Sequence, residues 1–319
     1  MKIKNNFLLN LFQKEVQFWT SFFIMYKTRQ IDMTFVHSFW SKPLLEGKFN
    51  KFDTQLPVIL SDYAYSVACI KHFGHKIKLY TDNFGKELLS FIGYDEIIVI
   101  DGIDEKSIHF AAQIKFEALK RMGLDEYLID GDMFLRRQPI YDILESIHTD
   151  FLYSFYEPYN YIFGYDLEHS TKLYKSELEI MKKYEDKFIA PYTLEEDLNK
   201  YEWPNTSLMK FGNQHLKEEY IRQYEYYKNL LEHEDFTSWP DVIIEQFHMG
   251  KLLNTGYKSR PVVYDFPSNE ANNYAYVIGF CHLGSQKVAL LEKTFEWLKE
   301  LDEKLYNKTM KTIDKFKKE

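Results

Sequence analysis

The sequence predicts an α/β fold in which helices flank a mostly parallel, Rossmann-like sheet, with a helical extension at the C-terminus. Three observations predict it. Short runs of β-forming residues alternate with segments of helical spacing between residues 34 and 129. Several of these runs lead into acidic turn segments, and residues 288–316 form a long charged stretch of helical character. Because strand–helix–strand units give parallel strands, ligands are expected beyond the carboxyl ends of the strands.

The elements of the first half follow one another regularly. The expected strands are 34–39, 76–80, 96–100 and 126–129, and the expected helices between them are 61–73, 84–91 and 110–122. We expect Ser61 to cap the first helix and Gly74 to close it, since these residue types favour helix ends. Gly123 is expected to end the third helix in the same way.

The second half is less regular. The expected helices are 139–147, 167–184, 214–231, 242–253 and 288–316, and the expected strands are 150–155, 207–211, 261–264 and 276–280. No internal repeat, low-complexity tract or Gly/Ser linker divides the chain. We therefore expect residues 33–287 to form a single domain, followed by a C-terminal helix over 288–319.

The composition excludes several classes of protein. With 319 residues and 45% hydrophobic side chains, the chain can bury a full core, which excludes disorder. Its two cysteines cannot hold a secreted scaffold, and no C-x-x-C is present for zinc or redox chemistry. The net charge of −8 argues against a nucleic-acid partner, which requires a basic surface. A polyphosphate ligand would therefore need a local binding device.

Residues 1–32 are set apart from the fold. The apolar stretches 7–12 and 18–26 are separated by polar residues, so neither is long enough to cross a membrane. No small-residue cleavage site follows, which argues against a signal peptide. One interpretation is an amphipathic segment that lies on a membrane surface or a partner. The alternative is a loosely attached extension or an upstream start, because Met33 precedes the first strand. The expected location is cytoplasmic, peripheral to the inner face of the membrane.

An acidic motif, Asp130-Gly131-Asp132, stands at the carboxyl end of the strand 126–129. Carboxylates two residues apart point to one side when the chain turns out of a strand. Such hard oxygen ligands suit Mg²⁺ or Mn²⁺ bridging a diphosphate. The motif is short enough to arise by chance, and the alternative interpretation is a solvated turn.

A second motif, His282-Leu283-Gly284-Ser285-Gln286-Lys287, follows the apolar run 276–280. The His282 imidazole suits a metal ion and the Lys287 ammonium suits a phosphate, while Gly284 allows close backbone approach. The alternatives are a half-buried, hydrogen-bonded histidine and a solvated lysine.

Together, the strand-ending D-x-D and the late His-x-Gly-x-x-Lys resemble the family 8 glycosyltransferases, which have the GT-A fold, use nucleotide sugars and retain anomeric configuration. The resemblance implies that Asp130, Asp132 and His282 bind Mn²⁺ (or Mg²⁺), and that Asp130 and Lys287 contact the donor. Departure of a nucleoside diphosphate builds negative charge, which the metal ion and Lys287 would stabilise.

The resemblance covers residues 33–287, and only the two short motifs are distinctive. The family usually follows its late lysine with Pro-Trp, whereas this chain has Val288-Ala289. The segments His37–Pro43 and Asp130–Leu135 are also similar to a group of bacterial glycosyltransferase-like proteins without assigned activity.

Further positions match the family's donor site. Lys115 matches a basic residue near the donor, although a surface lysine is the alternative. Asn205-Thr206-Ser207 is similar to the segment that lines the sugar site, with Ser207 where glycine is expected. Ser38 and Trp40 lie beyond the first strand, where they would meet ribose and base; the alternative for Trp40 is the core.

The catalytic candidates are Asp241, Glu245 and Gln246. Glu245-Gln246 resembles the family's Asp-Gln pair near the anomeric carbon, with the polar face of a helix as the alternative. A retaining enzyme needs no base opposite the sugar, whereas an inverting enzyme would use Asp241 or Glu245 as the base. Retention is therefore implied by the resemblance alone.

Two other functions share features with this sequence. A haloacid-dehalogenase-type phosphatase has D-x-D followed by x-Thr/Val, but Phe134 stands in that last place. The second alternative is a non-catalytic carbohydrate-binding or interaction protein. In such a protein the aromatic side chains would stack against the ligand, and D-x-D would be a structural turn. The expected function is a glycosyltransferase with a nucleotide-sugar donor and a glycan, lipid-linked or protein acceptor; the donor sugar, base and linkage are left open.

Overall fold

The computed structural model describes residues 32–46, 52–103, 110–157, 180, 182–187, 203–234, 243–263 and 275–317. From Met33 onward the chain forms one compact unit by its contacts. Three of the expectations lie outside the described residues: the extension before Asp32, most of the helix 167–184, and Asp241. Within the described residues, no helix has the length and apolar character needed to cross a membrane.

An eight-stranded mixed sheet forms the centre of this unit. Its strands are β1 (Thr34–Phe39), β2 (Lys76–Thr81), β3 (Glu96–Val99), β4 (Glu126–Ile129), β6 (Phe151–Glu157), β7 (Trp203–Pro204), β8 (Leu208–Phe211) and β9 (Ser259–Val263). The order is β3-β2-β1-β4-β8-β6-β7, and β9 also pairs with β6. The first four strands are parallel, whereas β8 runs antiparallel to both β4 and β6. The carboxyl ends of β1, β2 and β4 therefore meet at one edge.

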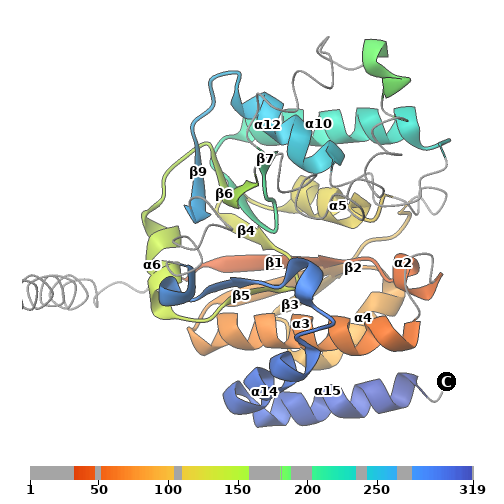
Figure 1. Ribbon diagram of the computed structural model, residues 1–319, viewed down its shortest axis with the longest axis vertical. Coiled ribbons are helices and arrows are strands. Elements are labelled where there is room, and N and C mark those ends of the chain that lie inside the picture. The colour runs from red at the N-terminus through yellow and green to blue at the C-terminus, as the bar shows by residue number, and fades with distance from the viewer. Residues whose placement is uncertain are drawn as a thin grey trace, which may run out of the picture. The chain divides into compact units, whose positions relative to one another are not determined.

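Helices cover both faces of the sheet (Figure 1). They are α2 (Lys42–Leu45), α3 (Phe52–His72), α4 (Asn83–Leu89), α5 (Gln113–Arg121), α6 (Gln138–Ser146), α10 (Gln214–Leu231), α12 (His248–Leu253), α14 (Leu291–Leu301) and α15 (Glu303–Phe316), with short 3-10 turns at Ser90–Ile92, Glu185–Lys187 and Gly284–Gln286 and a π-helical turn at Ile243–Phe247. Figure 1 shows α5, α10 and α12 on one side and α3 and α4 on the other, with α14 and α15 packed against α3. The predicted α/β class, a mostly parallel sheet flanked by helices with helices at the C-terminus, is confirmed.

The start of α3 differs from the prediction. The helix begins at Phe52, and Ser61 lies inside it, buried, where its hydroxyl donates to the Val58 carbonyl. Pro57 also lies inside the helix, which continues through it. The reason is packing: Leu56 and the residues after it bury their side chains against the core.

The predicted strand 276–280 is also wrong. Residues 275–278 form a helical turn, and the strand is β10 (Phe280–His282). Gly279 has a φ of 86°, which lets the chain turn sharply into β10. A strand that the sequence did not predict, β5 (Met133–Leu135), pairs antiparallel with β10. We call this pair the β5–β10 ribbon.

The single long helix predicted over 288–316 is in fact two. The chain breaks at Asp302, which has φ −149° and ψ 85°, and the Asp302 side chain accepts from the Leu305 backbone N–H at 2.8 Å. Aspartate favours helix starts because it satisfies such a free amide. The break lets both α14 and α15 contact α3.

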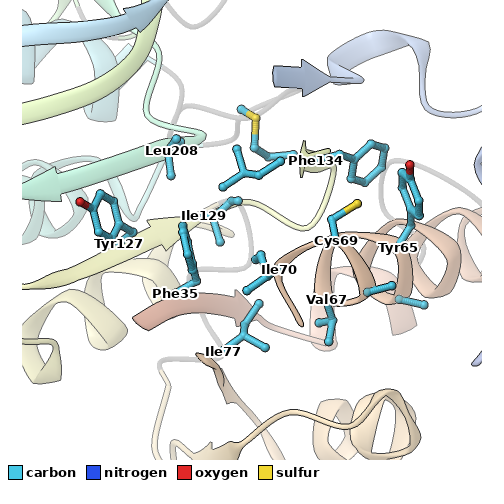
Figure 2. Packing of buried hydrophobic residues seen from close by; sticks show 14 of the residues in the cluster. Phe35, Tyr65, Val67, Cys69, Ile70, Ile77, Tyr127, Ile129, Phe134 and Leu208 are labelled. Carbon is cyan, nitrogen blue, oxygen red and sulfur yellow. The ribbon is translucent and has the colours of Figure 1, made fainter. Parts of the chain in front are cut away.

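The core fixes α3 against the segments that carry the acidic motif (Figure 2). Phe35 of β1 stacks on Tyr127 of β4 with ring centres 5.3 Å apart. Phe134 of the ribbon packs edge-on against Tyr65 of α3 at 4.8 Å, as Figure 2 shows. Residues on both sides of Asp130-Gly131-Asp132 are therefore held in the core, so the motif itself has little freedom.

Candidate functional site

The acidic motif lies where β4 leaves the sheet. The backbone N–H of Asp130 donates to the Ser207 carbonyl at 2.7 Å, and the N–H of Met133 donates back to the Asp130 carbonyl at 3.1 Å. Between the two aspartates, Gly131 lies flat against a tyrosine: a Cβ built on Gly131 would stand 2.3 Å from the Tyr63 ring. Only glycine leaves room for the ring here.

We therefore expect Gly131→Ala to destabilise the fold by about 1–3 kcal/mol, the usual cost of overpacking. The added methyl group must push Tyr63 away, although the Tyr63 hydroxyl donates to the Ser38 carbonyl at 2.7 Å. Urea denaturation measures the loss. The matched control is the same change in a Tyr63→Ala background, where it should cost much less; an equal cost in both backgrounds would show that the ring contact is not the cause.

Asp132 is brought together with both candidate residues of the late motif, His282 and Lys287. Its Oδ2 lies 2.9 Å from the Lys287 ammonium and 3.6 Å from His282 Nε2. The β5–β10 ribbon causes this, because it places His282 opposite Met133 and lets the Leu283 N–H donate to the Asp132 carbonyl at 3.1 Å. Asp132 is 7% exposed, so the solvated-turn interpretation is wrong for this residue.

The charges around Asp132 set the ionisation of this cluster. Burial opposes ionisation of Asp132, but the charges of Lys287 and His282 outweigh it and lower its pKa to about 2. Burial lowers the pKa of His282, with Asp132 opposing and Lys287 adding to the effect. At neutral pH the cluster thus holds a carboxylate, an ammonium and a neutral imidazole.

Asp130 belongs to a second cluster, centred on Lys115. The Lys115 ammonium lies 3.3 Å from Asp130 Oδ1 and 2.5 Å from Glu245 Oε1, and donates to the Thr206 carbonyl at 3.0 Å. The Thr206 hydroxyl also donates to Glu245 Oε1, at 2.5 Å. Lys115 is 6% exposed, so its interpretation as a surface lysine is wrong.

The ionisation of the second cluster follows from its burial. Burial of Lys115 favours loss of its proton, but Asp130 and Glu245 outweigh burial and raise the pKa of the ammonium. Burial raises the pKa of Asp130 to about 6, with Lys115 opposing and Asp132 adding to it. Lys115 is therefore a fixed cation that holds two carboxylates from distant parts of the chain.

The segment 205–207, which is expected to line the sugar site, is held by hydrogen bonds within the segment and to Ser154. Asn205 Oδ1 accepts from the Ser207 backbone N–H at 3.1 Å and from the Ser207 hydroxyl. That hydroxyl also lies 2.8 Å from the Ser154 hydroxyl, which in turn accepts from the Leu208 N–H at 2.7 Å. The serine that replaces the expected glycine is thus buried and used in a network between β6 and β8.

Glu245 and Gln246 lie in the π-helical turn Ile243–Phe247, and both are buried. A π-turn widens a helix locally and re-aims its side chains. Glu245 faces Lys115, whereas Gln246 Oε1 has no hydrogen-bond partner in the described part of the chain. A solvated helix face is therefore the wrong interpretation for either residue.

Ser38 and Trp40 lie at the carboxyl end of β1. The Ser38 carbonyl accepts from Tyr63, which ties this strand end to the ring beneath Gly131. Trp40 is 7% exposed and belongs to an apolar cluster with Val36 and Tyr80. The core placement, the alternative for Trp40, is the one observed.

One buried carboxyl group near the Asp132 cluster (Asp132, His282 and Lys287) was missed by the sequence analysis. Asp62 of α3 is 3% exposed, and its Oδ1 has no hydrogen-bond partner among the described residues. Burial, then the charge of Asp132, raises the pKa of Asp62 to about 8, against the effect of Lys287. Asp62 lies one and two turns before Ser66 and Cys69, which are both buried. This helical spacing is a signal for its inward position, and it was hidden by taking Ser61 as a cap.

Asp62 should make stability depend on pH. Its pKa of about 8 in the folded chain exceeds the unfolded value near 4, so between these values the folded state binds a proton that the unfolded state has lost. Its contribution therefore falls as pH rises, by up to about 1.4 kcal/mol per pH unit. We expect Asp62→Asn, which has no such proton, to gain stability relative to wild type between pH 5 and 8. Urea denaturation at both pH values measures this, and parallel profiles would contradict it.

The side chains around Asp132 include ligand types that bind divalent cations. A carboxylate oxygen and a neutral imidazole nitrogen, the pair Asp132 and His282, are ligands that Mn²⁺ accepts. Asp130, the third expected ligand, faces Lys115. Within the described ranges, no three His, Cys, Asp or Glu side chains stand close enough together to hold a metal ion.

Comparisons with known proteins give a likeness to solved structures but none to a protein family or a curated sequence. No protein-family model matches the chain, and no curated protein matches its sequence. Among solved structures, the galactosyltransferase LgtC in complex with donor and acceptor sugar analogues is similar, with a TM-score of 0.42 and 13% sequence identity over 85% of this chain and 96% of that one.

Proposed function

We propose that this protein is a metal-dependent, GT-A-like glycosyltransferase that moves a sugar from a nucleotide-diphosphate sugar to a glycan, lipid-linked or protein acceptor. One observation carries the proposal: His282 and Lys287 contact Asp132 although they lie far along the chain. They do so beyond the carboxyl end of a parallel strand, where α/β sheets bind ligands. A metal-ligand pair beside a phosphate-binding cation is the arrangement that a diphosphate donor requires.

Each residue of the Asp132 cluster has a role in this proposal. Asp132 and His282 would hold Mn²⁺ or Mg²⁺, with Asp130 at the edge of the same site. The bound cation would supply Lewis-acid stabilisation of the leaving diphosphate. Lys287, whose side chain is 43% exposed, would offer a second positive charge to a phosphate oxygen.

Lys115, Glu245 and Gln246 would serve the sugar side of the site. Glu245 Oε1 already accepts from Lys115 and Thr206, which favours a positioning role over that of a free general base. This supports transfer with retention, which needs no base opposite the leaving group. Gln246 Oε1, which has no partner in the described part of the chain, is proposed to accept from a sugar hydroxyl. Asp241 stays a candidate from the sequence alone.

The remaining proposals rest on the sequence. Ser38, Trp40 and Asn205 are proposed to shape the wall of the donor site, with the buried Trp40 acting through packing. Residues 1–32 are proposed to contact the inner face of the membrane from the cytoplasm, and no nucleic-acid partner is proposed, given the net charge of −8.

Hydrolysis of nucleotide-diphosphate sugars in the absence of acceptor tests the proposal. UDP-, GDP- and dTDP-sugars are incubated with the protein, with and without Mn²⁺, and release of the nucleoside diphosphate is measured. We expect release from one base class, and only with the cation. Cation-dependent binding without any release would instead indicate a non-catalytic carbohydrate-binding protein, and absence of both would overturn the proposal.

A further inference from the structure

Lys287 occupies the approach to Asp132. Its ammonium lies 2.9 Å from Asp132 Oδ2, the same oxygen that faces His282 Nε2 at 3.6 Å. An ammonium on that oxygen repels an incoming divalent cation and uses the lone pairs that the cation needs. A cation that binds Asp132 and His282 must therefore displace Lys287.

The displaced ammonium needs another partner, because it leaves an ion pair beside a buried carboxylate. Lys287 is able to move, since it follows the short turn Gly284–Gln286 and its side chain is 43% exposed. Both Asp132 and Asp62 act electrostatically on Lys287, and both favour its charged form. Asp62 also lies close by in the fold, because its neighbour Tyr63 packs against Gly131 and because Ser66, one turn later on α3, donates to the Met133 carbonyl at 2.8 Å.

Asp62 has a buried carboxyl oxygen, Oδ1, that could accept a hydrogen bond from the displaced ammonium. It is 3% exposed, and its Oδ1 has no hydrogen-bond partner among the described residues. A buried polar atom without a partner is rare in folded proteins and calls for an explanation. A carboxyl oxygen accepts a hydrogen bond whether or not the group is ionised, so Asp62 is able to receive an ammonium in either form.

We propose that Lys287 is a tethered counter-ion that occupies Asp132 until a divalent cation displaces it, and that Asp62 then receives the ammonium until a donor phosphate takes its place. Asp62 is in this sense a positioning residue for Lys287. The inference rests on the proposed function only for the identity of the cation and of the phosphate. It predicts that the lysine competes with the metal ion, and that Asp62 weakens this competition.

Calorimetric titration with MnCl₂ alone tests the inference, without any sugar nucleotide. The variants are Lys287→Gln, Asp62→Leu, Asp62→Asn and the double variant with Lys287→Gln and Asp62→Leu. Lys293→Gln is the matched control, since it removes the same charge from an exposed pair with Glu296. Thermal unfolding verifies that every variant is folded, and Asp62→Leu should fold because it removes an unpaired buried oxygen.

The Mn²⁺ affinities of wild type, Lys287→Gln, Asp62→Leu and the double variant form a double-mutant cycle. Lys287→Gln should bind Mn²⁺ about tenfold more tightly than wild type, the effect of removing one close competing charge. Asp62→Leu should bind it about tenfold more weakly, Asp62→Asn close to wild type because its amide oxygen still accepts, and Lys293→Gln like wild type. In the double variant, the effect of Asp62→Leu should vanish, because no ammonium remains to be received.

Three outcomes would overturn the inference. They are Mn²⁺ binding that Lys287→Gln does not tighten, an effect of Asp62→Leu that persists in the double variant, and no Mn²⁺ binding by any variant. None of these depends on sugar transfer. If the binding cycle holds while no nucleotide sugar is hydrolysed, the proposed function fails alone; if hydrolysis occurs while the cycle fails, the inference fails alone.

Discussion

Replacing Asp132 by asparagine is expected to lower Mn²⁺-dependent hydrolysis of the donor by about 100-fold or more, the usual cost of losing one electrostatic group at a reacting centre. Asp132 meets both His282 and Lys287. The variant keeps the shape of the side chain but loses the charge that would attract the proposed cation. The Lys287 side chain is 43% exposed and has Asp62 as an alternative acceptor, so the fold should persist. Initial rates of nucleoside diphosphate release measure the effect.

Asp125→Asn is the matched control for that experiment. Asp125 precedes the same strand, β4, but is exposed and lies at its opposite end. It should retain the wild-type rate. If Asp132→Asn also retains the rate while remaining folded, Asp132 is not part of the catalytic machinery.

Replacing Lys115 by methionine is expected to destabilise the protein by about 3–5 kcal/mol, the cost of breaking a buried ion pair from one side. The Lys115 and Glu245 side chains are both almost fully buried, so the variant would leave the Glu245 carboxylate without its cation. Urea denaturation measures the loss of unfolding free energy.

Two further variants make the Lys115 result specific. Lys120→Met, on the same helix α5, removes an exposed ammonium that pairs with Glu117, and should cost no more than about 1 kcal/mol. Adding Glu245→Gln to Lys115→Met should recover part of the loss, because the orphaned charge is removed. A loss below 1 kcal/mol in Lys115→Met would contradict the view that this pair is buried and structural.

Local patterns were enough to predict the centre of the sheet. The strands at 34–39, 76–80 and 126–129 are found because their apolar β-forming residues are bounded by clear turn signals. The ribbon strand Met133–Leu135 is only three residues long, and its pairing with β10 is set by tertiary packing. The break at Asp302 was missed because helical periodicity continues across it.

The candidate site likewise contains residues that local patterns predict and residues that only the tertiary fold brings together. The motif residues Asp132, His282 and Lys287 were recognisable by spacing, and the structure places them together. Pairing between Lys115 and Glu245 was not predictable, since no local pattern joins residues on α5 to a π-helical turn. Asp62 was missed for a related reason: a polar residue near an apparent helix start is ordinarily solvated, and only the longer α3 buries it.

A thermal-shift screen of UDP-, GDP-, CMP- and dTDP-sugars, with and without Mn²⁺, tests the central claim most directly. A ligand that binds only the folded state raises the melting temperature. We expect a rise for one nucleotide base class, present only with Mn²⁺ and absent in Asp132→Asn. A chain whose melting temperature responds to no nucleotide sugar with Mn²⁺ present would contradict the claim that the Asp132 cluster is a donor site.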